Sequence, residues 1–297
     1  MNSIQSNNLL QKIATEKSIK RILVPIDFSE ASHNAFEYAM HIAEMLDASL
    51  SVLHVYQGLH ADISYIPAQL VSALLEEKLE KANSLLRDYL SEAKTNLGKS
   101  VKVSSHLRSG KAPSEIVRFA EEQDADLIII GTQGTNSPSE QILGSIAARV
   151  IQRSSSCPVL AIPSKAKFSP IYKIMYALNF EEDDAENVEK LIVFSKALKG
   201  NLICTNIKSK HSEWNPNKDL LLNELKKWED AGNLSIAIKE TQNVIGGLRD
   251  FIYQNSIDII AMKTHKESAG LLELSQSLTR KMLMEVQVPI LAFQSEA

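Results

Sequence analysis

Three glycines and one serine between residues 130 and 145 have the spacing of a phosphate-binding loop. The segment reads IGTQGTNSPSEQILGS, so Gly131, Gly134, Gly144 and Ser145 form the pattern G-x2-G-x9-G-S. Glycines let backbone N–H groups approach an anion without an intervening Cβ, and a helix N-terminus adds further N–H donors and a positive dipole end. The pattern therefore predicts a site for a phosphate-bearing ligand.

The residues around this loop predict the elements that position it. Residues 124–130 read DADLIII, which is typical of a buried strand, and residues 146–154 read IAARVIQRS, which is typical of an amphipathic helix. Taken alone, Gly131 is better explained as a turn glycine, and Gly144-Ser145 as an ordinary helix start. Their combination in register between a strand and a helix favours nucleotide binding.

Strand-like and helix-like segments alternate through the first half of the chain. The expected strands are residues 22–27, 50–55, 101–107, 127–131 and 158–163, and the expected helices are 33–46, 67–95, 113–123 and 146–154. Strands that are apolar on both faces and alternate with helices predict an α/β fold with a doubly wound parallel sheet. The apolar stripe from Leu70 to Leu90 is interpreted as core or as an interface, and His41 and His54 as packed or solvated.

The second half of the sequence weakly repeats the first. Residues 20–55 align with residues 172–207 without a gap, residues 126–134 match 258–266, and residues 157–163 match 288–293. A repeat about one domain long indicates a tandem duplication rather than a solenoid. We therefore expect a tail at residues 1–18, domains at 19–164 and 171–297, and a linker at 165–170.

The bulk composition favours a cytoplasmic protein with two cores. The chain has 297 residues, a net charge of -4 and a pI near 6.0, which disfavour nucleic acid as a partner. Its two cysteines, Cys157 and Cys204, form no C-x-x-C pair, which disfavours a disulfide framework or a structural zinc site. No apolar stretch approaches the length of a membrane span, and the first residues lack the apolar core of a secretory signal.

Five short motifs together resemble those of the universal stress protein family, over about residues 20–164. They are V-P-I-D-F-S-E from Val24, His54-Val55, Gly110-x-x-Pro113, the G-x2-G-x9-G-S pattern and Cys157-Pro158-Val159. The resemblance implies a Rossmann-like, adenine nucleotide alpha hydrolase-like domain with strand order 3-2-1-4-5. One branch of the family binds ATP through this glycine pattern. The layout of the whole chain is similar to that of a tandem member.

The implied strand order places the site at the carboxyl ends of the first and fourth strands, where the crossovers leave on opposite faces of the sheet. The resemblance assigns Asp27, with the backbone of Pro25, Ile26 and Val55, to adenine and ribose. It assigns the ribose and phosphates to Gly131, Gly134, Gly144, Ser145 and the N–H of Ile146, and Ile130 reaches the same crevice at the end of the fourth strand. Asp27 has an alternative explanation as a cap of the following helix, and Ser145 is expected to cap its own helix.

The resemblance implies ATP or ADP as the ligand, with or without Mg²⁺. Residues 135–143 contain Glu140 and no lysine or arginine, so the phosphates would depend on backbone N–H groups, the helix end and a metal ion. No Walker lysine, arginine finger or water-activating residue is evident, so fast hydrolysis is not expected.

The second half lacks the glycine pattern. Asn179 stands at the position of Asp27, Lys263 at that of Gly131 and Lys266 at that of Gly134, while Gly144-Ser145 falls near Ser275-Gln276. We expect this half to bind no ATP in the glycine-loop mode, and Lys263 to lie in a solvated loop. Its expected role is to pair with the first half through residues 159–162 and 290–293, as separate family subunits pair into dimers. Whether two chains pair again into a homodimer stays open.

Two functions of different classes follow. The first is a cytoplasmic ATP- or ADP-binding stress regulator whose occupancy changes a surface for an unknown protein partner. The second is a protein–protein interaction or assembly module whose glycine loop is inherited and empty. An α/β ligase is disfavoured, because no HIGH-like, KMSKS-like or S-G-G-x-D-S segment occurs.

Overall fold

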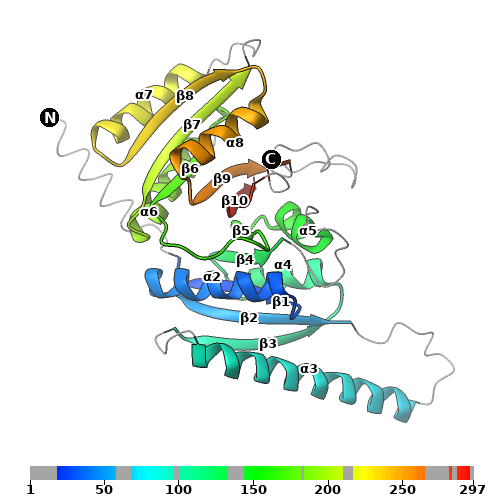
Figure 1. Ribbon diagram of the computed structural model, residues 1–297. Coiled ribbons are helices and arrows are strands. Elements are labelled where there is room, and N and C mark those ends of the chain that lie inside the picture. The colour runs from blue at the N-terminus through cyan, green and yellow to red at the C-terminus, as the bar shows by residue number, and fades with distance from the viewer. Residues whose placement is uncertain are drawn as a thin grey trace.

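Ten strands form one sheet in this computed structural model (Figure 1). The structure describes residues 19–57, 68–96, 101–132, 144–181, 184–209, 217–264, 281–282 and 286–294. The strand order is β3-β2-β1-β4-β5-β10-β9-β6-β7-β8. Each half of the sheet therefore has the order 3-2-1-4-5 counted from its outer edge, as the family resemblance implies.

The elements of each half alternate between strands and helices. The first half consists of β1 (Arg21–Ile26), α2 (Glu30–Leu46), β2 (Ser49–Tyr56), α3 (Ala68–Asn96), β3 (Val103–Ser109), α4 (Ala112–Glu122), β4 (Leu127–Gly131), α5 (Ser145–Arg153) and β5 (Val159–Ile162). The second half consists of β6 (Lys173–Ala177), α6 (Asp184–Ala197), β7 (Asn201–Ser209), α7 (Asn217–Asp230), β8 (Leu234–Thr241), α8 (Val244–Asn255), β9 (Ile259–Thr264) and β10 (Ile290–Gln294).

The two halves meet where β5 pairs with β10. This pairing is antiparallel, whereas the strands within each half pair in parallel. Leu160 lies opposite Leu291, and both side chains are buried. The pairing of these two segments, predicted from the repeat, is therefore confirmed.

Alternate strand residues point into two apolar layers, each of which continues across both halves. Ile22 and Val24 of β1 face the layer covered by α2, α3, α6 and α7, whereas Leu23 faces the layer covered by α4, α5 and α8. The hydrophobic effect therefore fixes the strand register, because a shift by one residue would exchange the two faces.

Helix α3 is buried toward its C-terminal end and exposed toward its N-terminal end. Leu86 and Leu90 are buried, but Leu70 and Leu75, nearer the N-terminus, are 53% and 39% exposed. The N-terminal part of α3 extends past the end of the neighbouring strands (Figure 1), which explains why the predicted stripe is buried at one end only. None of the described helices combines the length and apolar character that crossing a membrane requires.

Candidate functional site

The carboxyl ends of β1, β2 and β4 form the edge where the sequence places the ligand. Strand β2 continues to Tyr56, two residues past His54, which pairs with the last residue of β1. The carbonyl of Tyr56 accepts a hydrogen bond from Gly110 N on the β3 side, at 3.2 Å. Because consecutive strand residues present their peptide groups to opposite sides, those of Val55 face the space beyond β1. This placement suits the predicted contact between the Val55 backbone and a base.

Asp27 follows β1 directly and is half-buried. Its Oδ1 accepts hydrogen bonds from the N–H and the hydroxyl of Ser29, at 3.1 and 2.5 Å. Ser29 is in turn the N-cap of α2, since its Oγ accepts from Ser32 N at 3.2 Å. The alternative that Asp27 itself caps α2 is therefore wrong. The carboxylate instead accepts hydrogen bonds from the serine that caps the helix.

The turn between Asp27 and Ser29 requires a left-handed residue, and Phe28 supplies it with φ of 63°. This conformation is uncommon for a non-glycine residue and is maintained by its surroundings. The Phe28 ring packs 4.6 Å from the His54 ring and 5.8 Å from the Tyr89 ring, measured between centroids. The packing fixes the path of the chain that delivers Asp27.

His54 contacts β1 through a hydrogen bond between its Nδ1 and the carbonyl oxygen of Ile26, at 2.9 Å. The second half repeats this contact at corresponding positions, where Asn206 Nδ2 donates to Leu178 O at 2.7 Å. Because the second half has no glycine pattern, the shared contact is best explained by the fold. The interpretation of His54 as a packed residue rather than a ligand-binding one is consistent with this geometry.

Gly131 ends β4 in close contact with the first turn of α2. A Cβ at this position would lie 2.6 Å from Ala31 O and 3.1 Å from Ser32 N, both backbone atoms. The glycine is therefore required by packing alone, whether or not a ligand binds. Ser32 also receives a hydrogen bond from Asp27 N at 3.4 Å, so the first turn of α2 contacts both Gly131 and Asp27.

The end of β4 and the start of α5 are joined through Thr132. Its N–H donates to Ile162 O at 2.9 Å, and its carbonyl accepts from Gly144 N at 2.5 Å. Gly144 is the N-cap of α5 and Ser145 is its first helical residue, so the expectation that Ser145 caps the helix is wrong. Among the described residues, no side chain caps this helix, whose exposed first turn includes Ser145 and Ile146. Gly134 lies outside the described residues.

The corresponding edge of the second half is closed by its own side chains. The Lys263 side chain is 4% exposed, and its Nζ forms an ion pair with Glu181. The expected solvated loop is therefore wrong for Lys263, whereas Lys266, Ser275 and Gln276 lie outside the described residues. A buried, ion-paired lysine therefore stands at the position that Gly131 occupies in the first half.

A buried carboxylate organises the turn before α6 in this second half. Asp184 has no exposed surface, and its Oδ1 accepts from Tyr176 Oη at 2.6 Å. Its Oδ2 accepts from Asn179 N and Glu181 N, at 3.2 and 3.1 Å. Asp184 corresponds to Ser32 in the repeat, so an internal acceptor here replaces the hydroxyl of the first half.

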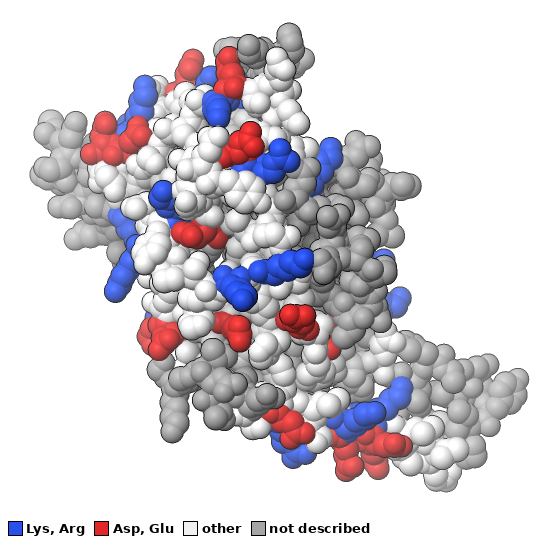
Figure 2. All heavy atoms as spheres, in the orientation of Figure 1, with Lys and Arg blue, Asp and Glu red and all other residues white. Residues whose placement is uncertain are grey.

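Charge around the site does not by itself identify a ligand. Figure 2 shows Lys and Arg side chains mixed with Asp and Glu over one face, without segregation by sign among the residues coloured. Within the described part of the chain, no group of three or more His, Cys, Asp or Glu could hold a metal ion.

Sequence reasoning missed the two serines that support the site. Ser29 and Ser32 stand at the spacing of an N-cap and its third helical residue, S-x-x-S, directly after Asp27. A serine three residues before another polar residue at a helix start is the sequence signal of such a cap, although Asp27 offers a competing cap in the same run.

Replacing Ser29 by alanine should lower the free energy of unfolding by about 1–2 kcal/mol, since the N-cap bond and the hydroxyl contact with Asp27 are both lost. Urea unfolding measures this change. Ser91→Ala is the matched control, because Ser91 Oγ bonds to the Asp88 carbonyl of its own helix, at 2.8 Å, and should change stability by less than about 0.5 kcal/mol. Equal stability of Ser29→Ala and wild type would contradict the assigned cap.

Comparison with known proteins matches the sequence of the first half to one family. The model of the universal stress protein family matches residues 18–163. Universal stress protein MJ0531 of Methanocaldococcus jannaschii is 34% identical over 157 residues, which cover 51% of this chain and 86% of that protein. Universal stress protein YxiE of Bacillus subtilis is 30% identical over 148 residues, which cover 48% of this chain and 97% of that protein.

One similar solved structure extends over almost the whole chain. The crystal structure of a universal stress protein from Archaeoglobus fulgidus covers 93% of this chain and 97% of its own, with a TM-score of 0.70 and 17% identity. At this identity the likeness shows the fold alone. The family model and the curated relatives carry the assignment of the first half, and the chain belongs to the universal stress protein family.

Proposed function

We propose that the first half, residues 19–164, binds ATP or ADP, with or without Mg²⁺, and that the chain acts as a nucleotide-dependent stress regulator in the cytoplasm. In this proposal residues 171–297 form a second domain of the same type that binds no nucleotide and pairs with the first through β5 and β10. Binding, rather than fast hydrolysis, is the proposed activity.

The observation that carries the proposal is the link between Thr132 and Gly144. It brings the carboxyl end of β4 and the N-terminus of α5 together, so that Gly131, Gly144, Ser145 and Ile146 lie at one edge of the sheet. A helix N-terminus at this edge suits a phosphate, because its N–H groups and dipole both favour an anion.

The remaining proposed contacts come from the neighbouring strands. Pro25, Ile26 and Asp27 stand at the end of β1, and Ile130 stands beside Gly131 in β4. The Asp27 carboxylate offers acceptor oxygens to a ribose hydroxyl or an exocyclic amine, while Val55 offers backbone groups beyond β1. Gly134 belongs to the proposed site by its place in the sequence pattern.

A second candidate function is an interaction or assembly module with an empty loop. The specific observation in its favour is that packing against Ala31 alone explains why residue 131 is glycine. Under this alternative the glycine pattern would be kept by the fold, and an unidentified protein partner would be the relevant ligand.

Nucleotide released from purified protein separates the two functions. Wild type should release ATP or ADP on denaturation, whereas Gly144→Val should carry at least tenfold less. The reason is that valine introduces a branched Cβ at the helix start, and losing even one charge-assisted hydrogen bond to phosphate weakens binding by roughly 10-fold to 100-fold. Chromatography of the released nucleotide measures the nucleotide content, and calorimetry with Mg-ATP measures the binding affinity.

The matched control is Gly246→Ala, at the start of α8 in the second half, which should leave the nucleotide content unchanged. Failure of wild type to release nucleotide and to bind Mg-ATP would exclude the regulator and favour the module.

A further inference from the structure

One face of α2 joins the candidate site to the segment between the two halves. Ala31, Asn34, Tyr38 and His41 follow one another at intervals of three or four residues, so they lie on the same face of the helix. The backbone of Ala31 packs directly against Gly131. The other three residues, named the α2 clamp, contact residues 163–168.

Asn34 makes the first contact of the clamp. Its Nδ2 donates to Pro163 O at 3.0 Å and to Ala166 O at 2.6 Å. The segment itself forms a turn there, since Ala166 N donates to Pro163 O at 3.0 Å. One amide side chain therefore satisfies two carbonyls of a chain segment that belongs to neither sheet half.

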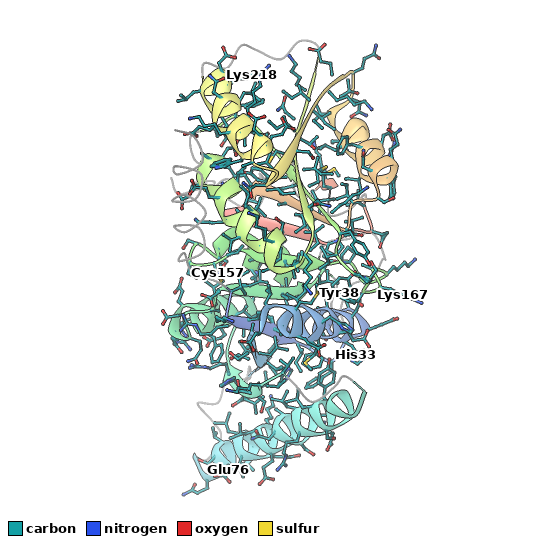
Figure 3. All side chains as sticks on the ribbon, turned by 90° about the vertical axis from the view of Figure 1, so that its left-hand side faces the viewer. His33, Tyr38, Glu76, Cys157, Lys167 and Lys218 are labelled. Atoms are coloured by element: carbon teal, nitrogen blue, oxygen red, sulfur yellow. The ribbon has the colours of Figure 1, made fainter. Side chains whose placement is uncertain are left out.

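Tyr38 and His41 make the next contacts, one and two turns further along α2. Tyr38 Oη donates to Lys167 O at 2.8 Å, and the His41 ring stacks on the Phe168 ring with 4.1 Å between centroids and 14° between planes. Figure 3 shows Tyr38 beside Lys167, on the side of α2 that faces the second half. Phe168 also packs edge-on against Tyr38, with 5.2 Å between ring centroids.

The segment that the clamp holds leads directly into the second half. Burial raises the pKa of Tyr38 to about 12, and the negative charge of Asp258 in the second half adds to this effect. Asp258 Oδ2 accepts from Tyr172 N and Lys173 N, at 2.8 and 2.9 Å, and so holds the start of β6.

A second helix connects the same two regions from the opposite face of the sheet. Helix α5 begins at Ser145, directly after its N-cap Gly144, and contacts β5 and β10. Its residues Ala147 and Val150 share an apolar layer with Ile290 and Ala292 of the second half. Of the two helices that border the candidate site, α2 therefore contacts the linker and α5 contacts the second half.

We propose that the α2 clamp couples nucleotide binding in the first half to the position of the linker and of the second half. This inference rests on the proposed function and adds that the linker and the second half respond to the bound nucleotide. Helix α2 is a single rigid element of 17 residues whose first turn contacts Gly131 and Asp27 and whose later turns hold the linker. A ligand that orders the first turn therefore orders the clamp as well, and by reciprocity an intact clamp favours binding.

Hydrogen exchange and calorimetry on the full chain test the coupling, with Mg-ATP as the probe. In wild type, Mg-ATP should slow exchange of the backbone amides of residues 164–168. Tyr38→Phe, which keeps the ring and removes one hydrogen bond, should abolish part of this protection. Asn34→Ala combined with His41→Ala should remove it and weaken Mg-ATP binding at least fivefold. Glu44→Ala, an exposed position of the same helix, should behave as wild type.

The outcomes distinguish the proposed coupling from the proposed nucleotide binding on which it rests. If wild type binds no Mg-ATP, the proposed nucleotide site and the coupling both fall. If wild type binds Mg-ATP but residues 164–168 exchange at an unchanged rate, or the clamp variants bind as wild type does, the coupling alone is overturned. Tyr38→Phe guards against a trivial loss of folding, since its circular dichroism should match that of wild type.

Discussion

Gly131→Ala should unfold at markedly lower urea concentration than wild type and should bind Mg-ATP at least tenfold more weakly. The added Cβ would lie 2.6 Å from Ala31 O and 2.8 Å from Ala31 C, and neither backbone atom can rotate away. Strand β4 and helix α2 would have to separate, at an expected loss of about 2–3 kcal/mol in the free energy of unfolding. The same displacement would move Ser32, which contacts Asp27.

A glycine in a different setting provides the control. At Gly246 the nearest atom to an added Cβ is Asn243 Nδ2, a side-chain end at 3.3 Å, and alanine favours a helix by about 1 kcal/mol over glycine. Gly246→Ala should therefore be as stable as wild type or slightly more stable. If both variants unfold like wild type, the close approach of β4 and α2 is wrong.

Asp184→Ala should lower the free energy of unfolding by about 3–5 kcal/mol. It would leave the Tyr176 hydroxyl and the N–H groups of Asn179 and Glu181 without their acceptor inside the protein, and each such group costs about 1–3 kcal/mol. Both tryptophans of the chain, Trp214 and Trp228, belong to the second half, so tryptophan fluorescence during urea unfolding follows this region.

A conservative change at Tyr176, a partner of Asp184, separates the loss of one side-chain partner from the loss of all the Asp184 contacts. Tyr176→Phe removes the hydroxyl, which donates to Asp184 and accepts from Asn187 Nδ2, but Asp184 keeps both backbone donors, so the expected loss is about 1–2 kcal/mol. Similar effects of the two variants would show that the backbone contacts of Asp184 contribute little.

The parallel sheet could be predicted from the sequence pattern, whereas the order of its strands is what the family resemblance implies. Apolar runs with helices between them predict a doubly wound parallel sheet, because the pattern of apolar residues records burial directly. The order 3-2-1-4-5 and the pairing of residues 159–162 with 290–293 follow from the resemblance and the repeat, and the structure has both.

The identity of the capping residues could not be derived from the same pattern. Ser29 rather than Asp27 caps α2 because Phe28 adopts a positive φ, and Phe180 does the same in the second half. A phenylalanine gives no local signal for that conformation, since glycine or asparagine usually occupies it. Likewise, Gly144 rather than Ser145 caps α5, although serine is the usual N-cap residue.

Long-range partners explain the other differences. Lys263 looks solvated in a polar sequence, but Glu181, distant in the chain, pairs with it inside the second half. The packing reason for Gly131 is equally remote, because Ala31 lies 100 residues earlier. Only the folded arrangement shows that the same glycine serves packing and borders the proposed phosphate site.

The number of nucleotides bound per chain tests the central claim most directly, because the first half is proposed to bind adenine nucleotide and the second half is not. Calorimetric titration of nucleotide-free protein with Mg-ATP should give one site per chain, abolished by Gly144→Val. No binding would contradict the proposed site in the first half, and two sites per chain would contradict the closed edge around Lys263 in the second.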